Sequence, residues 1–291
     1  MASCLWCGAG VTANPEELTV GCGRCGTRTT SPFPTEAELE EAYRGWYRPD
    51  SGRFLGLGDA FLRRSRSMLA ARIDNAAPSG AVLDVGAGDG TLIDALRGVG
   101  RQTMGLELES RHPDIAELDI QDVSGTWGAI IFWHSLEHLP RPRESVRRAV
   151  QLLATGGLLI VAVPNISSIQ ARLFKDRWFA LDLPRHLVHL SRAALIDGLE
   201  EEGLVVARVS DVRGGQVLFG WLHGLVGLWP GRPNLYTAIR RPEARDQRMG
   251  RLQKLTAYVA AVVMLAPALI ASIAECAFRR GGTTYVEARR V

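Results

Sequence analysis

A glycine-rich loop between an apolar strand pattern and a helix pattern is the feature that most constrains the fold of this chain. The strand pattern covers residues 81–85, the loop covers Gly86–Gly90, and apolar residues then recur at helical spacing over 91–99. Glycines at this turn let the backbone fold tightly and approach a ligand at the carboxyl end of the strand. A strand–loop–helix unit of this kind predicts an α/β fold, in which helices cover a mostly parallel sheet.

Strand and helix patterns continue to alternate through residues 56–213, which is typical of a layered α/β domain. The patterns at 128–133 and 157–163 are continuous apolar runs, as expected for parallel strands buried on both faces. The composition, 46% hydrophobic and 22% charged, is that of a globular chain. We expect helices at 59–75, 91–99, 143–153 and 192–202, and strands at 81–85, 102–107, 114–118, 128–133, 157–163, 204–211 and 283–288.

The residues around the loop restrict the ligand that it can bind. Its Gly-x-Gly-x-Gly spacing differs from the Gly-x-Gly-x-x-Gly of dinucleotide sites, which disfavours a nicotinamide oxidoreductase. Asp84 and Asp89 flank the loop and would repel a pyrophosphate, whereas two carboxylates suit the sulfonium and ammonium groups of S-adenosylmethionine. Glu107 follows the next strand, where it can accept ribose hydroxyls, and Asp119 follows the third, where it can reach an adenine amine. The alternative is an ordinary glycine-rich turn with solvated acids.

Three segments occur in the order Leu83–Gly90, Ile130–Leu139 and Leu152–Asn165. They resemble the first, fourth-strand and fifth-strand motifs of the class I S-adenosylmethionine-dependent methyltransferases. The resemblance implies a seven-stranded Rossmann-like sheet with helices on both faces, whose last strand is antiparallel and inserted between the fifth and sixth. It also implies cofactor contacts at Asp84, Gly86, Ala87, Gly88, Glu107, Asp119, Trp133 and His134.

Two Cys-x-x-Cys pairs near the start of the chain predict a metal site. Cys4 and Cys7 form the first pair, Cys22 and Cys25 form the second, and 14 residues separate the two pairs. Four thiolates on facing turns give zinc the closed tetrahedron of a structural site, with no open position for catalysis. The alternatives are a redox dithiol, for which the second pair would be superfluous, and a degenerate site that has lost its metal.

The whole chain is similar to bacterial methyltransferases that carry an N-terminal zinc ribbon, a Pro-rich turn and a Tyr-containing helix. Several such enzymes modify sugars, glycan intermediates or secondary metabolites, so the resemblance implies an acceptor of that kind. The sequence divides accordingly into a zinc ribbon (1–30), a linker with a short helix at 36–47 (31–55), a methyltransferase domain (56–213 and 281–291) and an apolar helical insertion (214–280).

Residues 177–190 are the candidate acceptor-side segment, because they follow the fifth strand and are dense in aromatic and titratable side chains. His186 or His189 is a candidate general base, since an imidazole titrates near neutrality. Arg185 is a candidate ligand for an anionic group of the acceptor. The competing interpretation is that these histidines are surface or hydrogen-bonded structural residues, and His138 is interpreted as positional.

The expected activity is methyl transfer to a small molecule or to a glycan or lipid-linked intermediate, with oxygen as the favoured acceptor atom. Methylation of carbon or nitrogen, and a non-catalytic S-adenosylmethionine-binding protein, are the alternatives. Nucleic acid is not an expected partner, because the net charge is only +3 and residues 1–56 carry no basic–aromatic stripe. Paired thiols that bind metal are typical of a reducing compartment, so a cytoplasmic protein is expected.

The stretch Ala257–Ala274 contains no charged residue. Its 18 residues are at the lower limit for a helix that spans a membrane, but a return of 283–288 to the sheet would keep both ends on one side. Basic residues flank the stretch at Arg251 and Lys254 and at Arg279 and Arg280. The sequence therefore predicts a helical hairpin or in-plane anchor broken near Pro267, peripheral at the inner face of the membrane. A soluble cap, the surface of a homodimer and a true spanning helix remain open.

Overall fold

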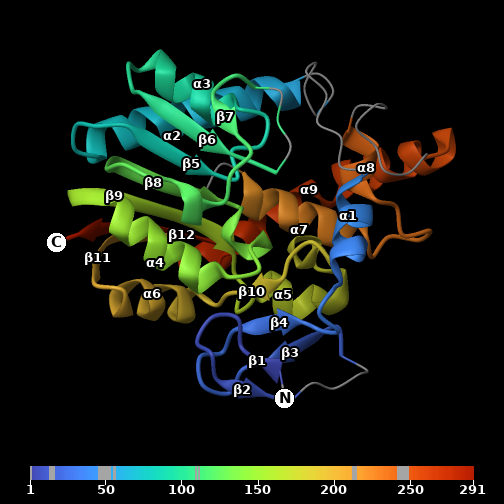
Figure 1. The fold of residues 1–291 in the computed structure, drawn as a ribbon. Coiled ribbons are helices and arrows are strands. Elements are labelled where there is room, and N and C mark those ends of the chain that lie inside the picture. Colours follow the sequence, from blue (N-terminus) through green and yellow to red (C-terminus); the bar gives the residue numbers. More distant parts are fainter. Residues whose placement is uncertain are drawn as a thin grey trace.

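The computed structural model describes residues 2–12, 17–44, 54, 57–108, 110, 112–211, 215–240 and 249–291. Its central sheet has seven strands: β5 (Val82–Val85), β6 (Thr103–Leu106), β7 (Ile115–Ala116), β8 (Trp127–Trp133), β9 (Leu153–Pro164), β11 (Leu204–Ser210) and β12 (Thr283–Arg290). They lie in the order β11-β12-β9-β8-β5-β6-β7, and β12 is antiparallel to both of its neighbours (Figure 1). The predicted Rossmann-like methyltransferase topology, with the last strand inserted beside the fifth, is confirmed.

Helices cover both faces of this sheet. One face carries α2 (Leu57–Ala76) and α3 (Thr91–Gly98), and the other carries α4 (Pro142–Leu152) and α6 (Arg192–Glu201). Successive strand residues point to opposite faces, so an unbroken apolar run supplies both cores. In β8 and β9, Ala129, Ile131, Leu158 and Ile160 face α2 and α3, whereas Ile130, Phe132, Leu159 and Val161 face α4 and α6.

Local signals fix where several helices begin. Pro142 occupies the first turn of α4, where its missing N–H costs nothing, and Ser191 caps α6 by accepting the N–H of Ala194 at 3.1 Å. The remaining helices are α1 (Glu36–Arg44), α5 (Ile169–Phe174), α7 (Gln216–Val226), α8 (Leu235–Ile239) and α9 (Arg251–Ala277), and four 3₁₀ turns lie at Ile120–Asp122, Leu136–His138, Lys175–Arg177 and Phe179–Leu181. The predicted linker helix begins at Glu36 as expected, and its predicted end at 45–47 lies outside the described residues.

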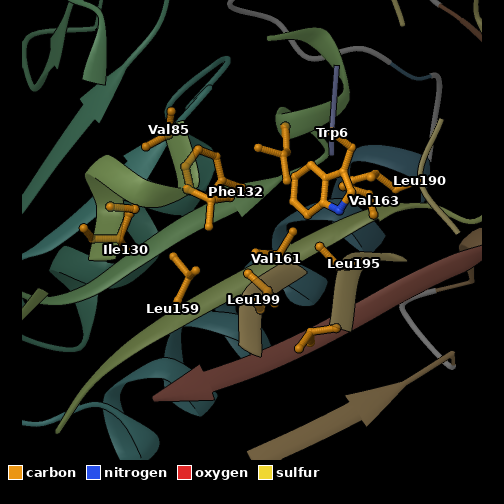
Figure 2. Packing of buried hydrophobic residues seen from close by; sticks show 14 of the residues in the cluster. Trp6, Val85, Ile130, Phe132, Leu159, Val161, Val163, Leu190, Leu195 and Leu199 are labelled. Carbon is orange, nitrogen blue, oxygen red and sulfur yellow. The ribbon is translucent and has the colours of Figure 1, made fainter. Parts of the chain in front are cut away.

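The N-terminal cysteine module, residues 2–30, is joined to the α/β domain. Its strands are β1 (Ala2–Ser3), β2 (Gly10–Val11), β3 (Thr19–Gly21) and β4 (Arg28–Thr30), and a strand from the acceptor-side segment, β10 (Val188–His189), pairs with β4. The indole of Trp6 is 2% exposed and lies beside Leu190 and Val163 (Figure 2). The module therefore shares the hydrophobic core of the domain.

The apolar insertion forms three helices beside the sheet. Both α7 and α8 pack against α9, with Trp221 and Val226 of α7 buried at these contacts. The break predicted near Pro267 is wrong, because α9 is one continuous helix of 27 residues with Pro267 inside it. Pro267 lies on the exposed side, while Ala260 and Ala268 are buried on either side of it, so packing holds the helix together across the missing hydrogen bond.

Candidate active site

The loop Gly86–Gly90 joins β5 to α3 at the carboxyl ends of the parallel strands. Gly86 and Gly90 have φ angles of 79° and 76°, a left-handed conformation that other residues rarely adopt. A Cβ at Gly86 would lie 2.3 Å from Ser135 Cβ, and one at Gly90 would lie 2.4 Å from His112 Cδ2. Both positions therefore require glycine, for the turn and for the close packing around it.

The carboxylate of Glu107 meets this loop. Because β5 and β6 are neighbouring parallel strands, Glu107 lies beside the glycines, where its Oε2 accepts the N–H of Gly88 at 2.9 Å. Its Oε1 accepts the N–H of Leu108 at 3.0 Å. These two backbone N–H groups hold the Glu107 carboxylate beside the loop, where a ligand bound against the glycines would meet it.

Asp84 is the most deeply buried acid of the loop region. It is 2% exposed, and its Oδ1 has no hydrogen-bond partner among the described residues. Burial raises the pKa of this carboxyl to about 7, and the charge of Arg66 on α2 opposes the rise. The Arg66 guanidinium lies 4.8 Å from the centroid of the Trp133 ring. Asp84 and the half-buried Trp133 thus lie at the same edge of the sheet, with Arg66 near both, and this pair fits a ligand that brings positive charge and an aromatic base.

The other sequence-predicted cofactor residues lie at the same edge of the sheet. Trp133 ends β8, and its indole Nε1 has no partner among the described residues. His134 follows with φ 53°, and its Nε2 lies 3.2 Å from Oε1 of Gln216, the first residue of α7. Asp119 is exposed and caps a 3₁₀ turn by accepting the N–H of Gln121 at 2.9 Å. Its side chain is thus engaged in local structure.

A second cluster of polar groups follows β8, on the side of the acceptor segment. Glu137 is 2% exposed, and its Oε1 lies 3.3 Å from His134 Nδ1 and 3.9 Å from His186 Nε2. The His138 and His186 rings meet edge to face, with centroids 4.5 Å apart. One ligand atom each from Glu137, His138 and His186 lies within 4.8 Å of the others, so the group is compact enough to share a proton or hold a cation.

The His186 ring is fixed in one orientation. Its Nδ1 lies 2.9 Å from the carbonyl oxygen of Ala180, so Nδ1–H donates there and Nε2 keeps its lone pair. Nε2 faces Glu137 and also Asp182, whose Oδ2 is 3.7 Å away. Burial, together with the nearby His138 and His189 rings, holds the pKa of His186 well below its usual value. The imidazole is therefore neutral at neutral pH.

Arg185 and Tyr43 complete the rim of this cluster. The Arg185 guanidinium donates to Asp182 Oδ1 at 2.5 Å, so it is already paired with a carboxylate of the same segment. Tyr43, on the linker helix α1, lies with its hydroxyl 2.9 Å from His138 Nδ1, and burial raises the pKa of that phenol. The linker helix thus contributes a side chain to the site.

His189 lies at the edge of the cluster, in the strand that pairs with the cysteine module, and its ring centroid is 6.3 Å from that of His186. Its Nε2 is 3.1 Å from Thr30 Oγ1 of β4, and the residue is 3% exposed. Burial and the charge of Arg28 lower the pKa of His189 to about 4. Of the two candidate bases, only His186 faces Glu137 through a nitrogen with a free lone pair.

The four thiols of the cysteine module converge. Cys4 Sγ and Cys25 Sγ are 3.7 Å apart, Cys7 Sγ and Cys22 Sγ are 3.5 Å apart, and all four lie within 4.8 Å of one another. A tetrahedron with zinc–sulfur bonds of about 2.3 Å has edges of about 3.8 Å, so the donor set fits zinc. The fifth thiol, Cys276, lies in α9, away from this group.

Sequence reasoning gave no role to three residues of the site: Arg66, Glu137 and Gln216. Glu137 carried a usable signal, since an acid directly after a buried parallel strand lies at the ligand-binding edge of the sheet. Arg66 and Gln216 carried none, because only the packing of α2 and α7 brings them to this edge.

The family model described as "Methyltransferase domain" matches residues 58–209. A ubiquinone biosynthesis O-methyltransferase of Xanthomonas campestris pv. campestris is 30% identical over 115 residues, which cover 33% of this chain and 47% of that protein. The chain thus matches about half the length of this curated relative.

Among solved structures, a SAM-dependent methyltransferase of Thermotoga maritima is 12% identical with a TM-score of 0.45, covering 88% of this chain and 95% of that one. Another from Archaeoglobus fulgidus is 13% identical with a TM-score of 0.47, covering 77% and 94%.

Proposed function

The chain belongs to the methyltransferase domain family, and we propose that it methylates an oxygen atom of a small-molecule, glycan or lipid-linked acceptor. Family membership gives the enzyme class, an S-adenosylmethionine-dependent methyltransferase. The acceptor atom is argued from one observation, the neutral His186 imidazole whose free Nε2 faces the buried Glu137 carboxylate.

The loop residues fit S-adenosylmethionine, which when bound supplies an electrophilic methyl group on a sulfonium. Asp84 is buried, and its Oδ1 has no hydrogen-bond partner in the part of the chain that the structure describes, so a cationic ligand would relieve the cost of its burial. Glu107 is held by two backbone N–H groups and would accept the ribose hydroxyls. Trp133 and the loop backbone would flank the adenosine, while His134 would contact the ligand at the end of β8.

His186 is the proposed general base. A hydroxyl must lose its proton as it attacks carbon, whereas a neutral amine can attack through its own lone pair, so a positioned base favours an oxygen acceptor. Nε2 of His186 would take this proton while Nδ1–H stays on the Ala180 carbonyl. The Glu137 carboxylate, 3.9 Å away, would stabilise the resulting imidazolium. Transfer to carbon also needs proton removal and remains the nearest alternative, followed by transfer to nitrogen.

The lipid-linked option is supported by the position of α7. Its first residue, Gln216, contacts His134, and the rest of the helix packs along α9. A ring of aromatic side chains, Phe179, Phe219, His223 and Tyr236, lies between α7, α8 and the acceptor segment, with Phe179 and Phe219 centroids 5.2 Å apart. An acceptor with an apolar portion could use this aromatic surface.

The test is transfer of tritiated methyl groups from S-adenosylmethionine into the lipid, glycan and small-molecule fractions of a cell extract. The fraction that becomes labelled then serves as acceptor for His186→Asn and for the matched variant His189→Asn, which removes an equally buried histidine of the same segment. We expect kcat to fall about 100-fold or more for His186→Asn and to change little for His189→Asn. Full kcat in His186→Asn would overturn the base assignment, and cofactor binding without labelling of any fraction would favour a non-catalytic protein.

We also propose that Cys4, Cys7, Cys22 and Cys25 hold a structural zinc ion. The sulfur separations match a zinc tetrahedron, and four protein ligands leave no open coordination position. The metal would then stabilise the module that supports β10 rather than take part in methyl transfer.

A further inference from the structure

The outer face of α9 is a surface of large apolar side chains. Leu252, Leu255, Val262, Ile270, Ile273 and the following Phe278 are 59–76% exposed. The helix is long and apolar enough to cross a membrane by length and composition, and only 22% of its most apolar 18-residue window is buried. We call this surface the α9 outer face. A continuous row of exposed large apolar side chains on a folded protein marks an interaction site.

The two sides of α9 have the opposite character to those of an ordinary soluble helix. The buried positions are occupied by small or polar residues, Ala257, Ala260, Ala268, Ser272 and Glu275, while the largest apolar side chains point outward. Glu275 is fully buried, where its carboxylate accepts the Trp221 indole N–H at 2.8 Å and the backbone N–H of Gln170 at 2.9 Å. The only acid of α9 is thus turned inward, and none of the α9 residues on the outer face is acidic.

Both ends of α9 are tied to the same folded body. Near its start, the Tyr258 hydroxyl donates to the Ala238 carbonyl of α8 at 2.9 Å. After its end, Asn165 donates to the Gly281 carbonyl at 3.0 Å, and β12 enters the central sheet. A helix of 27 residues, about 40 Å long, that is held along one side and at both ends cannot pass through a bilayer, but it can lie flat on one.

Basic residues stand at both ends of the outer face. Arg251 and Lys254 lie in the first turn of α9, and Arg279 and Arg280 follow its last turn. If a second copy covered this face, parallel and antiparallel pairing of the two helices would each bring cations beside cations. An anionic surface is complementary to both ends at once and can also accept the apolar side chains between them.

We propose that the α9 outer face docks in the plane of a lipid bilayer that contains anionic lipids, with the large apolar side chains in the acyl boundary and the arginines at the headgroups. Docking at this depth buries the apolar side chains without breaking any contact between α9 and the sheet domain. It does not depend on the acceptor or on the base proposed above.

The experiment is co-sedimentation of the full chain with vesicles of phosphatidylcholine alone and of phosphatidylcholine mixed with phosphatidylglycerol. We expect binding to the mixed vesicles and weaker binding to phosphatidylcholine. The variant Val262→Glu/Ile270→Glu should bind the mixed vesicles at least about tenfold more weakly, because two large apolar side chains no longer enter the bilayer. The control Met68→Glu changes a side chain that is 65% exposed on α2, outside this face, and should bind as the wild type does.

A second pair of measurements separates docking from misfolding and from self-association. Arg279→Gln/Arg280→Gln keeps the apolar face, so its binding to the mixed vesicles should fall toward the level seen with phosphatidylcholine alone. Circular dichroism and S-adenosylmethionine binding should stay unchanged in every variant. Sedimentation equilibrium reports the oligomeric state. Absence of wild-type binding to both kinds of vesicle would overturn the proposal. So would a wild-type dimer that fails to bind vesicles and that Val262→Glu/Ile270→Glu converts to a monomer.

Discussion

The indole Nε1–H of Trp6 donates to the backbone carbonyl of Ala194, 188 residues later in the chain, at 2.8 Å. The bond fastens the cysteine module to α6, and β10 extends the sheet of the module through β4. The same β10 segment runs on from His186. The cysteine module therefore supports the segment that positions the candidate base, and unfolding of the module should destabilise the α/β domain.

The Trp6 indole packs directly against the backbone of Gly198 in α6, which leaves no room there for a side chain. A Cβ at Gly198 would lie 2.4 Å from Trp6 Cζ2, although glycine to alanine within a helix normally stabilises by up to about 1 kcal/mol. We expect Gly198→Ala to destabilise the protein by about 1–3 kcal/mol through overpacking. Gly98→Ala is the control, because a Cβ at that helical position meets nothing within 4 Å. Urea unfolding of both variants should give changes of opposite sign, and stabilisation by both would contradict this packing.

Removal of the proposed zinc ion should unfold more than the module that would bind it. Because Cys4 and Cys22 belong to the same buried core as Leu195 and Leu199 of α6, loss of the metal is expected to lower the melting temperature of the whole domain. Elemental analysis should find one zinc per chain in protein purified without chelator, and none in Cys22→Ser. Cys276→Ser should keep its zinc and its melting temperature close to those of the wild type. Zinc-free wild-type protein would rule out the metal site.

The sheet domain could be predicted from the sequence because its signals are local. The apolar runs of β8 and β9, the glycine loop and the Ser191 cap each act within a few residues, and helix and strand ends agree with the expected positions to within a few residues. The continuity of α9 through Pro267 could not be predicted, because it depends on α7 and α8 packing against the flanking alanines.

The candidate site divides in the same way. Asp84 and Glu107 follow from the order of parallel strands, since neighbouring strands end at one edge. The contacts of His134 with Gln216 and of His138 with Tyr43 join residues 82 and 95 positions apart, and only the packing of α7 and α1 produces them. The different partners of His186 and His189 depend on the pairing of β10 with β4, and no sequence pattern predicts that pairing.

Binding of S-adenosylmethionine should tighten as pH rises. The pKa of Asp84 is about 7 because of burial, so its carboxyl is mainly neutral at pH 5.5 and mainly ionised at pH 7.5. Only the ionised form attracts a cationic ligand, and the fraction ionised rises by roughly a factor of 25 between these pH values. Titration calorimetry should therefore show Kd falling by about tenfold or more over this range.

Two variants isolate the contribution of Asp84. Asp84→Asn should bind more weakly and lose most of the pH dependence, because the titrating group is gone. Asp89→Asn changes an exposed acid of the same loop and leaves the Asp84 carboxyl in place, so its Kd should still fall as pH rises, whatever its affinity. If Asp84→Asn kept the full slope, the pH dependence would belong to another group.

Buried neutral histidines should make the protein less stable in mild acid. The pKa of His189 is about 4 in the folded protein because of burial, against 6.5 for an ordinary histidine, and that of His186 is also lowered. As pH falls below 6.5, the unfolded chain takes up protons that the folded protein does not, so the free energy of unfolding decreases. For His189 the loss of unfolding free energy extends from about pH 6.5 to about pH 4 and amounts to roughly 3 kcal/mol.

Urea unfolding at pH 7 and pH 5 should show a smaller loss of stability for His189→Asn than for the wild type. Leu190→Ala removes a buried neighbour that does not titrate, so it should lower stability equally at both pH values. If His189→Asn kept the pH slope of the wild type, the imidazole of His189 in the wild type would take up its proton in the folded protein as readily as in the unfolded chain.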